Sequence, residues 1–226
     1  NMRYQYNMRY QYLLFDLDGT ITDPKVGITT CVQYALEHFG IHEPDNDKLE
    51  PFIGPPLQDS FEQFYHMDAE TAKQAVAKYR ERFQTVGLYE NEIYDGMADL
   101  LKTLKEGGCR LAVASSKPTV FVKKILEHFD VAQYFDVVVG SELDGSRTKK
   151  EEVVQEALRQ LDPKDQASSG QMVMIGDRCF DVQGAKAHHL DSIGVAYGYA
   201  AEGELQQAGA TFVVDTVQQL KELLTR

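Results

Sequence analysis

The sequence predicts an α/β fold, in which helices cover both faces of a parallel sheet and a helical segment is inserted after the first strand. Three observations predict it: an apolar strand pattern near the N-terminus, a strand-free stretch of helical patterns after it, and a regular alternation of short apolar runs with amphipathic helices from Gly96 onward. Such alternation is typical of parallel sheets, whose crossover helices pack on the two faces.

The chain opens on a perfect repeat, because residues 1–6 and residues 7–12 both read NMRYQY. The repeat has no structural logic, so we interpret the first copy as an artefact and leave it out of the fold. The second copy continues into Tyr12-Leu13-Leu14-Phe15, and this apolar run predicts the first buried strand.

The next stretch, from about Pro24 to Glu92, has no clear strand and predicts helices at 26–39, 57–65 and 69–84. Turn-forming residues flank it near Asp23-Pro24 and near Tyr94-Asp95-Gly96. We therefore predict a helical cap domain, residues 24–92, inserted into an α/β core domain of residues 7–23 and 93–226. A mobile cap and a packing module without a part in the chemistry both remain open.

After Gly96 the apolar runs predict strands at 111–114, 137–139, 172–175, 193–196 and 212–214. The segments between and after them predict helices at 97–106, 118–128, 151–161, 181–188 and 216–224. Gly107-Gly108 and Pro163 are expected to end two of these helices, and Asp215 to cap the last one.

Composition limits the partners of this 226-residue chain. With 35 acidic against 23 basic residues the formal net charge is -12, which disfavours a nucleic acid polymer or an anionic membrane surface as partner. No run of about 18 apolar residues occurs, and because residues 1–12 lack the apolar stretch of a secretory signal we expect none. Cys31, Cys109 and Cys179 lack the spacing of a disulfide framework or a zinc site. We expect a cytoplasmic protein that acts on a small molecule.

Two carboxylates follow the first strand directly, in Phe15-Asp16-Leu17-Asp18-Gly19-Thr20. Ligands of open α/β sheets bind at the carboxyl ends of the strands. Because glycine allows a sharp backbone turn, Asp16 and Asp18 can converge there on a hard divalent cation together with a third acid. A simple turn built from Asp and Gly is the alternative.

Three more polar clusters lie at the ends of predicted strands. Ser115-Ser116-Lys117-Pro118 offers hydroxyls and a helix start that suits an anion, or else a plain N-cap at Ser116. Arg147-Thr148-Lys149-Lys150 places cations where the helix dipole opposes them, which favours a functional role over a solvated turn, without deciding which lysine points inward.

The last cluster is Gly176-Asp177-Arg178, with Asp181 four residues after Asp177. An acid directly after a buried strand is costly unless it is paired or binds a metal, which favours Asp177 as a metal ligand. Asp181 can cap the next helix or hold a metal-bound water. Together the four clusters supply a nucleophilic acid, a second acid for proton transfer, hydroxyls, a lysine and a Mg²⁺ site, the inventory that phosphoryl transfer needs.

This set, DLDGT at Asp16 to Thr20, Ser115, Lys150 and GDRxxD at Gly176 to Asp181, resembles the haloacid dehalogenase (HAD) superfamily of phosphohydrolases. The resemblance implies a Rossmann-like parallel sheet with a helical C1 cap. It implies that Asp16 attacks phosphorus to form an aspartyl phosphate, while Asp18 protonates the leaving alkoxide and later activates water.

The resemblance also implies the remaining roles. Asp16, the backbone carbonyl of Asp18, and Asp177 are expected to hold Mg²⁺, with Asp181 behind these ligands. Ser115 and Ser116 are expected to bind phosphoryl oxygens, and Lys150 to bridge the phosphate and Asp16. Lys150 is chosen over Lys149 because Lys150-Glu151-Glu152-Val153-Val154 looks like the Lys-x-Glu-Val-Ile run of the family.

Details of the motifs favour one branch of that superfamily. Asp18 argues against the dehalogenases, and the glycine before Asp177 favours hydrolysis over β-phosphoglucomutase-like chemistry. GDRxxD together with Asp144-Gly145-Ser146-Arg147 is similar to phosphoglycolate phosphatase-like proteins. Ser115-Ser116 is a departure, because those relatives often have Thr-Asn or Thr-Ser there.

The natural substrate stays open among phosphoglycolate, a nucleoside monophosphate (a 5'-nucleotidase), pyrophosphate and a sugar phosphate. The segment 52–57 looks like the cap loop that closes over the leaving group, although a proline-stiffened connection explains it equally well. A receiver-like signalling module that accepts a phosphoryl group is the rival from another class, but it has no use for a helical insertion or for Asp18. The oligomeric state is open, with a monomer slightly favoured.

Overall fold

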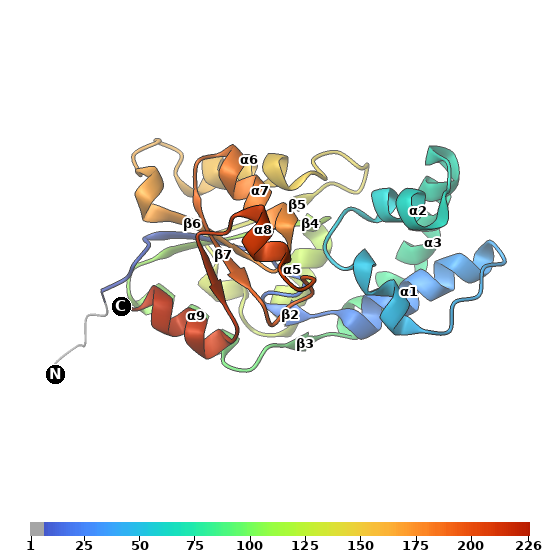
Figure 1. Ribbon diagram of the computed structural model, residues 1–226, viewed down its shortest axis with the longest axis horizontal. Helices are drawn as coiled ribbons and strands as arrows, with labels where there is room; N and C mark the ends of the chain where they lie inside the picture. Colours follow the sequence, from blue (N-terminus) through green and yellow to red (C-terminus); the bar gives the residue numbers. More distant parts are fainter. Residues whose placement is uncertain (1–6) are drawn as a thin grey trace.

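A computed structural model describes residues 7–226 as a six-stranded parallel sheet with helices on both faces and a further group of helices beyond one end of the sheet (Figure 1). The duplicated hexapeptide, residues 1–6, lies outside the described residues. The sheet order is β5-β4-β1-β6-β7-β8, with bounds Tyr12–Phe15 (β1), Arg110–Pro118 (β4), Val137–Ser141 (β5), Met172–Gly176 (β6), Asp191–Val195 (β7) and Phe212–Val214 (β8). The prediction of an α/β fold with a parallel sheet is confirmed.

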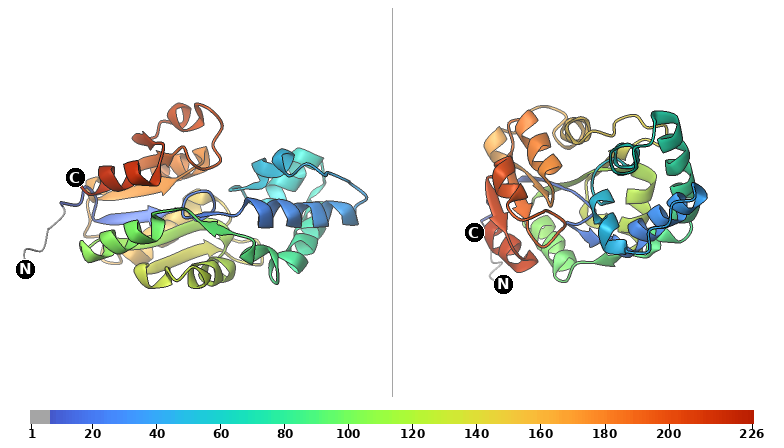
Figure 2. Two further views of the ribbon diagram at one scale, coloured as in Figure 1. Left: turned by 90° about the horizontal axis from the view of Figure 1, so that it is seen from below. Right: turned by 45° about the vertical axis from the view of Figure 1, so that its right-hand side comes forward.

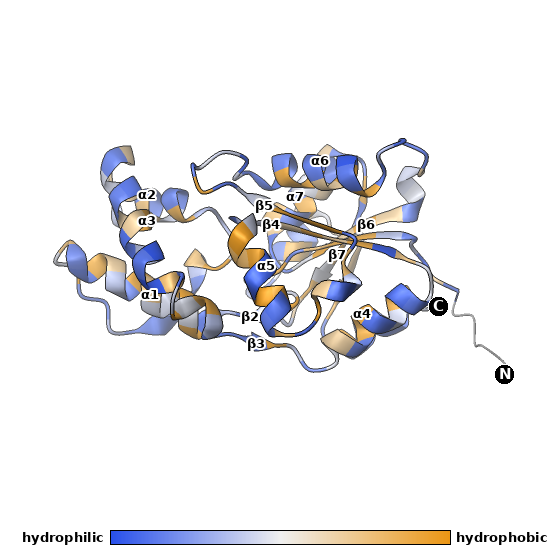
Figure 3. Cartoon of the chain, turned by 180° about the vertical axis from the view of Figure 1, so that it is seen from behind, coloured by the Kyte–Doolittle hydropathy of each residue, from blue (hydrophilic) through white to orange (hydrophobic). Residues whose placement is uncertain are grey.

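The central strand β1 shows how the sheet divides the core. Its side chains alternate between the two faces, so Leu13 and Phe15 belong to one buried cluster and Leu14 to another. All three are fully buried, which explains why the strand reads as a continuous apolar run. Figure 3 shows the same arrangement in the whole molecule, with apolar strands inside and polar helix surfaces outside.

Five helices cover the sheet. On one face lie α6 (Lys150–Leu161) and α7 (Cys179–Ala187), and on the other lie α4 (Met97–Glu106), α5 (Thr119–His128) and α9 (Val217–Leu224) (Figures 1 and 3). A short helix, α8 (Glu204–Ala208), packs against α7. Helix α8 was not predicted, because five residues are too few to show a helical period.

The helices beyond the sheet are α1 (Lys25–His38), α2 (Leu57–Tyr65) and α3 (Ala69–Phe83), with 3₁₀ segments at Asn46–Phe52 and Gly87–Tyr89. Figure 2 shows their separation from the sheet from two further directions. Both crossings between these helices and the sheet pass through a small antiparallel ribbon, formed by β2 (Thr22–Asp23) and β3 (Glu92–Ile93). The expectation of a strand-free stretch up to Glu92 is therefore wrong at its end, because a two-residue strand carries no periodic signal.

Three predicted helix starts are also wrong. Strand β4 continues through an irregularity after Ala114 to Pro118, so α5 begins at Thr119 and Ser116 is not its N-cap. The Thr216 side chain, and not Asp215, caps α9 by accepting from the Gln219 N–H. Helix α7 begins at Cys179, two residues before Asp181.

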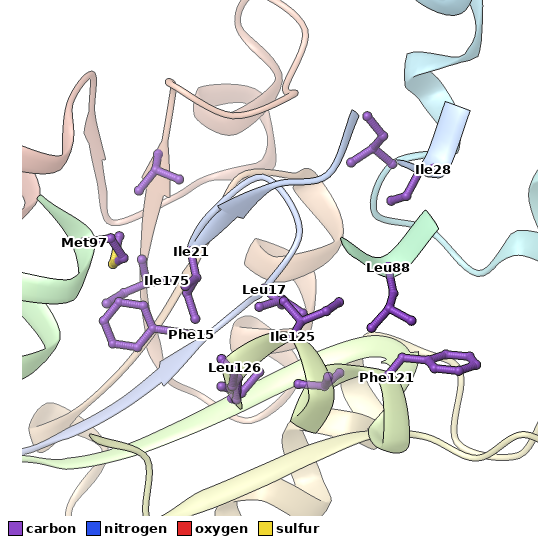
Figure 4. Close-up of a cluster of buried hydrophobic side chains, with 14 of the residues drawn as sticks. Phe15, Leu17, Ile21, Ile28, Leu88, Met97, Phe121, Ile125, Leu126 and Ile175 are labelled. Atoms are coloured by element: carbon purple, nitrogen blue, oxygen red, sulfur yellow. The ribbon is translucent and has the colours of Figure 1, made fainter. Parts of the chain in front are cut away.

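One buried apolar cluster runs from the sheet into the helices beyond it. It joins Phe15 and Ile175 of the sheet to Ile28 of α1 and to Leu88 (Figure 4). The ribbon and this cluster together fix where the inserted helices stand above the carboxyl ends of the strands. None of the helices in residues 7–226 is long and apolar enough to span a membrane.

Candidate active site

The predicted site residues meet at the carboxyl ends of three neighbouring strands. Asp16 follows β1, Ser115 lies in the last part of β4, and Asp177 follows β6. The Asp16 N–H still donates to the Ile175 carbonyl of β6 at 2.9 Å, so the sheet ladder holds the two acids side by side. All three residues are buried.

Lys150, the first residue of α6, connects two of the acids. Its Nζ lies 3.0 Å from Asp16 Oδ1 and 2.9 Å from Asp181 Oδ1, and it donates to the Ala114 carbonyl at 3.0 Å. The Lys149 side chain is exposed at the N-cap position of the same helix. The structure thus places Lys150, and not Lys149, beside Asp16.

Three carboxylates form a candidate metal centre. Asp16, Asp177 and Asp181 each offer an oxygen within 4.8 Å of the others, and all three are buried. The Tyr199 N–H donates to Asp177 Oδ2 at 2.8 Å, while Asp177 Oδ1 is buried and has no hydrogen-bond partner among the described residues. Because hard cations prefer carboxylate oxygens, this set can hold a divalent cation. Asp18 contributes no carboxylate to it.

Glycine is required beside this centre. Gly19 has a φ of +80°, and a Cβ atom at this position would overlap the Asp177 carboxylate. The turn after Asp18 can therefore approach Asp177 only because residue 19 has no side chain.

The concentration of buried acids shifts their pKa values upward. Burial raises the pKa of Asp16, although Lys150 opposes this, and burial and Asp16 raise the pKa of Asp177 well above its usual range. Burial and the nearby Asp16 raise the pKa of Asp181 to about 6, against the opposing effect of Lys150. Burial alone would lower the pKa of Lys150, but Asp16 and Asp181 outweigh it and raise that pKa. Lys150 is therefore charged near neutral pH, but its single positive charge cannot balance the charges of three carboxylates.

Asp181 has two structural partners besides its place in the cluster. Its Oδ2 accepts from the Arg178 N–H at 3.1 Å, which caps the first turn of α7, and its Oδ1 takes the ion pair with Lys150. The cap expected of Asp181 is therefore present, although the helix begins before it, while its other expected role, holding a metal-bound water, stays a prediction.

The side chain of Asp18 points to a different cation. Lys117 Nζ lies 3.2 Å from Asp18 Oδ2 and 4.3 Å from the centroid of the Phe83 ring at the end of α3. Asp18 Oδ1 is buried without a hydrogen-bond partner among the described residues. Lys117 belongs to the Ser115-Ser116-Lys117-Pro118 cluster, but its sequence predicts no contact with Phe83, which lies 34 positions earlier and is brought to it only by the fold.

The two serines differ in exposure. Ser115 is buried, and its hydroxyl accepts from the Lys117 N–H at 3.1 Å, which leaves the hydroxyl proton available as a donor. Ser116 is half-buried and lines a cavity, and its carbonyl accepts from the Ser141 hydroxyl at 2.8 Å.

A cavity of about 540 Å³ lies between these residues and the inserted helices. Asp18, Ser116 and Lys117 line its sheet side. Its other walls combine two kinds of side chain. Apolar and aromatic ones are Ile28, Phe52, Pro55, Pro56, Leu57, Val76, Tyr79, Phe83 and Phe121, and polar or charged ones include Gln58, Asp59, Lys73, Arg80, Asp144 and Thr148.

Two arginines connect the sheet domain to the inserted helices in opposite directions. Arg178 Nη1 donates to the Ile53 carbonyl at 2.9 Å, and its Nε pairs with Glu204 at 2.9 Å. Arg80 of α3 donates to the Leu143 carbonyl, in the loop after β5, at 2.9 Å. No sequence pattern predicts either contact, since both acceptors are backbone carbonyls.

Comparison with known proteins identifies the family. The family model of the haloacid dehalogenase-like hydrolases matches residues 13–195. A 5'-nucleotidase from Pseudomonas aeruginosa is 46% identical over 217 residues, with 96% of each chain covered. The tyrosine-protein kinase PtkA of Mycobacterium tuberculosis is 37% identical, with 95% of this chain and 72% of the kinase covered.

Among solved structures, a predicted phosphatase from Clostridium acetobutylicum is 48% identical and superimposes with a TM-score of 0.90, covering 94% of this chain and 97% of that one. The chain belongs to the haloacid dehalogenase-like hydrolases. Within this family it is a phosphatase, a phosphoric monoester hydrolase.

The ion pairs of Lys150 lead to a stability prediction. In metal-free buffer Lys150→Met should lower the free energy of unfolding by roughly 3–5 kcal/mol at pH 8, because it leaves two buried carboxylates without their cation. The loss should be smaller at pH 5, where acids with raised pKa values are largely protonated in the folded state. Urea denaturation at both pH values measures it. Lys149→Met is the control, expected to change the free energy by less than about 0.5 kcal/mol; equal losses at pH 5 and pH 8 would contradict the prediction.

Proposed function

We propose that this phosphatase is Mg²⁺-dependent and hydrolyses nucleoside 5'-monophosphates through a phosphorylated Asp16. The observation that carries the choice of substrate is the cavity of about 540 Å³, which joins a polar end beside Asp18 and Ser116 to a group of aromatic and aliphatic walls on the inserted segment. A nucleoside matches this division, because its 5'-oxygen is attached to a ribose and a flat base that can stack on aromatic side chains. The 46% identity to a 5'-nucleotidase supports the same choice.

Phosphoglycolate fits the walls less well. Its leaving group carries a carboxylate, which needs a cation in the cavity. Of the lysines and arginines that line the cavity among the described residues, Lys117 already pairs with Asp18 and Arg80 donates to the Leu143 carbonyl, which leaves Lys73, an exposed residue of α3. A leaving group of this size also leaves most of the cavity empty, so we place it second to a nucleotide.

The residues support a two-step reaction. In the first step a carboxylate oxygen of Asp16 bonds to phosphorus as the bond from phosphorus to the leaving oxygen breaks, and Asp18 gives that oxygen a proton. In the second step Asp18 takes a proton from water, whose oxygen bonds to phosphorus while the bond to Asp16 breaks. Lys150 neutralises Asp16 and the phosphoryl oxygens, and Ser115 and Ser116 donate hydrogen bonds to those oxygens.

The carboxylate cluster fits Mg²⁺. The state of Asp177 Oδ1 supports this fit. It is a buried oxygen without a hydrogen-bond partner among the described residues, and it lies in an all-carboxylate set with Asp16 and Asp181. Asp16 and Asp177 would hold the ion with the Asp18 carbonyl, and Asp181 would stand behind them through its pair with Lys150. When bound, Mg²⁺ supplies positive charge that offsets the repulsion between an anionic nucleophile and an anionic ester.

We also propose that residues 24–92 act as a lid over this cavity in a cytoplasmic, monomeric enzyme. The lid is supported by the two chain crossings at one ribbon and by the contacts that Arg80 and Arg178 make between the inserted segment and the sheet domain. Closure would exclude water while the phosphoryl group is transferred to Asp16.

The substrate proposal predicts selectivity among phosphate esters. With Mg²⁺, kcat/KM should be at least about tenfold higher for the best nucleoside 5'-monophosphate than for phosphoglycolate or pyrophosphate, because only the nucleotide fills the apolar walls. Phosphate release from a panel of the four common nucleotides and the two smaller substrates measures it. Asp16→Asn and excess EDTA are the controls, and each should abolish release. Higher kcat/KM for phosphoglycolate would overturn the choice of substrate.

The metal proposal predicts a pH-dependent stabilisation. Acids whose pKa is raised on folding stabilise the metal-free protein at low pH and cost stability as pH rises through their folded pKa, about 6 for Asp181. Mg²⁺ competes with those protons, so it should raise Tm by about 5–10 °C at pH 7.5 and by less than half of that at pH 5. Calorimetry at constant ionic strength measures the shift. Asp177→Asn should remove it at both pH values, and an equal shift at both in the unmodified protein would count against the cluster.

The lid proposal predicts a change of shape on binding a phosphate analogue. X-ray scattering should show a smaller radius of gyration with Mg²⁺ and vanadate than without them, because bound ligand favours the closed form. Adding excess EDTA should restore the profile of the free protein. Identical profiles in the three samples would mean that the inserted helices are a fixed packing module.

A further inference from the structure

Lys117 stands between the two parts of the site. It lies at the irregular end of β4, and its side chain is only 7% exposed. Its ammonium pairs with Asp18 Oδ2 at 3.2 Å on one side and lies over the Phe83 ring at 4.3 Å on the other. Asp18 belongs to the loop after β1, and Phe83 is the last residue of α3 in the inserted segment.

Burying an ammonium without partners is costly, so the groups around the Lys117 ammonium must compensate for its burial. The Phe83 ring is itself fixed by the Tyr79 ring at 5.2 Å and by the Phe121 ring at 5.3 Å. A cation over an aromatic face gains most when water is excluded from both, as it is here. Two attractions therefore act on one ammonium, one from the sheet domain and one from α3.

We propose that Lys117 is a positioning residue for proton transfer by Asp18, an inference that rests on the proposed function of Asp18. The ion pair occupies Oδ2 and fixes the carboxyl group, so that Oδ1, which is buried and has no hydrogen-bond partner among the described residues, is the oxygen left to carry the proton. Phe83 holds the ammonium in place only while α3 stands over the site. The acid is thus fully oriented only under the closed inserted helices.

Leaving groups of different basicity test this role. An alkoxide must receive a proton as it departs, whereas p-nitrophenolate is a weak base that leaves without one. kcat/KM covers the steps up to departure of the leaving group, so it isolates proton donation from the later hydrolysis of phospho-Asp16. The probes are AMP and β-glycerol phosphate as alkyl esters, and p-nitrophenyl phosphate as the aryl ester, all with Mg²⁺.

Lys117→Met keeps the length of the side chain and removes its charge. It should lower kcat/KM about 10- to 100-fold for both alkyl esters and less than about threefold for the aryl ester, since general acid catalysis contributes about 10²–10⁴-fold in all. The loss should lie in kcat rather than in KM. Lys117→Arg should recover most of the alkyl activity, because guanidinium can make both contacts. Lys124→Met, which replaces an exposed lysine on α5, is the matched control and should leave kcat/KM unchanged for all three esters.

Phe83→Leu tests the link to α3. It should lower kcat/KM for the alkyl esters selectively, but by a smaller factor than Lys117→Met. In the double variant it should add little to the effect of Lys117→Met, because both substitutions act through one ammonium. If the two losses add in full, Phe83 does not act on Asp18 through Lys117, and the proposed connection between α3 and Asp18 is wrong.

Asp18→Asn separates the failure of this inference from the failure of the proposed function. Suppose that Asp18→Asn lowers kcat/KM selectively for the alkyl esters, but Lys117→Met lowers kcat/KM equally for all three esters or raises only KM. Lys117 then binds substrate or supports folding, and the inference is overturned. If Asp18→Asn shows no selectivity, the proposed role of Asp18 fails, and the inference fails with it. If AMP is not hydrolysed at all, only the choice of nucleotides fails, and β-glycerol phosphate still tests Lys117.

Discussion

The site depends on one electrostatic constraint, the crowding of buried carboxylates at the carboxyl ends of β1 and β6. Asp16, Asp177 and Asp181 offer oxygens within 4.8 Å of one another, and Lys150 is the cation that contacts two of them. Such a cluster repels itself, so the rest of the fold must hold it in place. The parallel ladder between β1 and β6 does this through backbone hydrogen bonds that are indifferent to charge. The unbalanced charge is also what attracts a divalent cation.

The same constraint explains how the inserted helices are attached. The proposed lid would have to open and close above the cluster without disturbing the sheet below it. The β2–β3 ribbon brings both crossings to one place, and the buried apolar cluster continues through it from Phe15 to Ile28 (Figure 4). Separating the side chains of this cluster would expose apolar surface, at a free-energy cost of about 25 cal/mol per Å². A bend at the ribbon that leaves the cluster packed avoids this cost. The contacts that opening would break include the single hydrogen bonds of Arg80 and Arg178 and the contact of Lys117 with the Phe83 ring.

Local pattern was sufficient for much of the fold but not for all of the site. Strands β1 and β8 have the bounds that their apolar runs predict, whereas β2, β3 and α8 are too short to show a period. The acids after β1 and β6 could be placed because parallel strands bring their carboxyl ends together. Lys150 shares the spacing of the buried Val153, Val154 and Ala157, a signal that separates it from Lys149 without reference to any family. The contact between Lys117 and Phe83 depends on how α3 packs, which no local pattern contains.

The division of labour in the molecule follows from these points. The residues proposed to handle the phosphoryl group lie on the sheet domain, and most of the apolar walls that would meet the leaving group belong to the inserted segment. Changes in the inserted helices can therefore alter the substrate without altering the chemistry, which fits a family that contains relatives named as a nucleotidase and as a kinase. Lys117 is where the two functions meet. Its ammonium contacts Asp18 on one side and an aromatic wall of the cavity on the other, so recognition of a leaving group and its protonation share a single side chain.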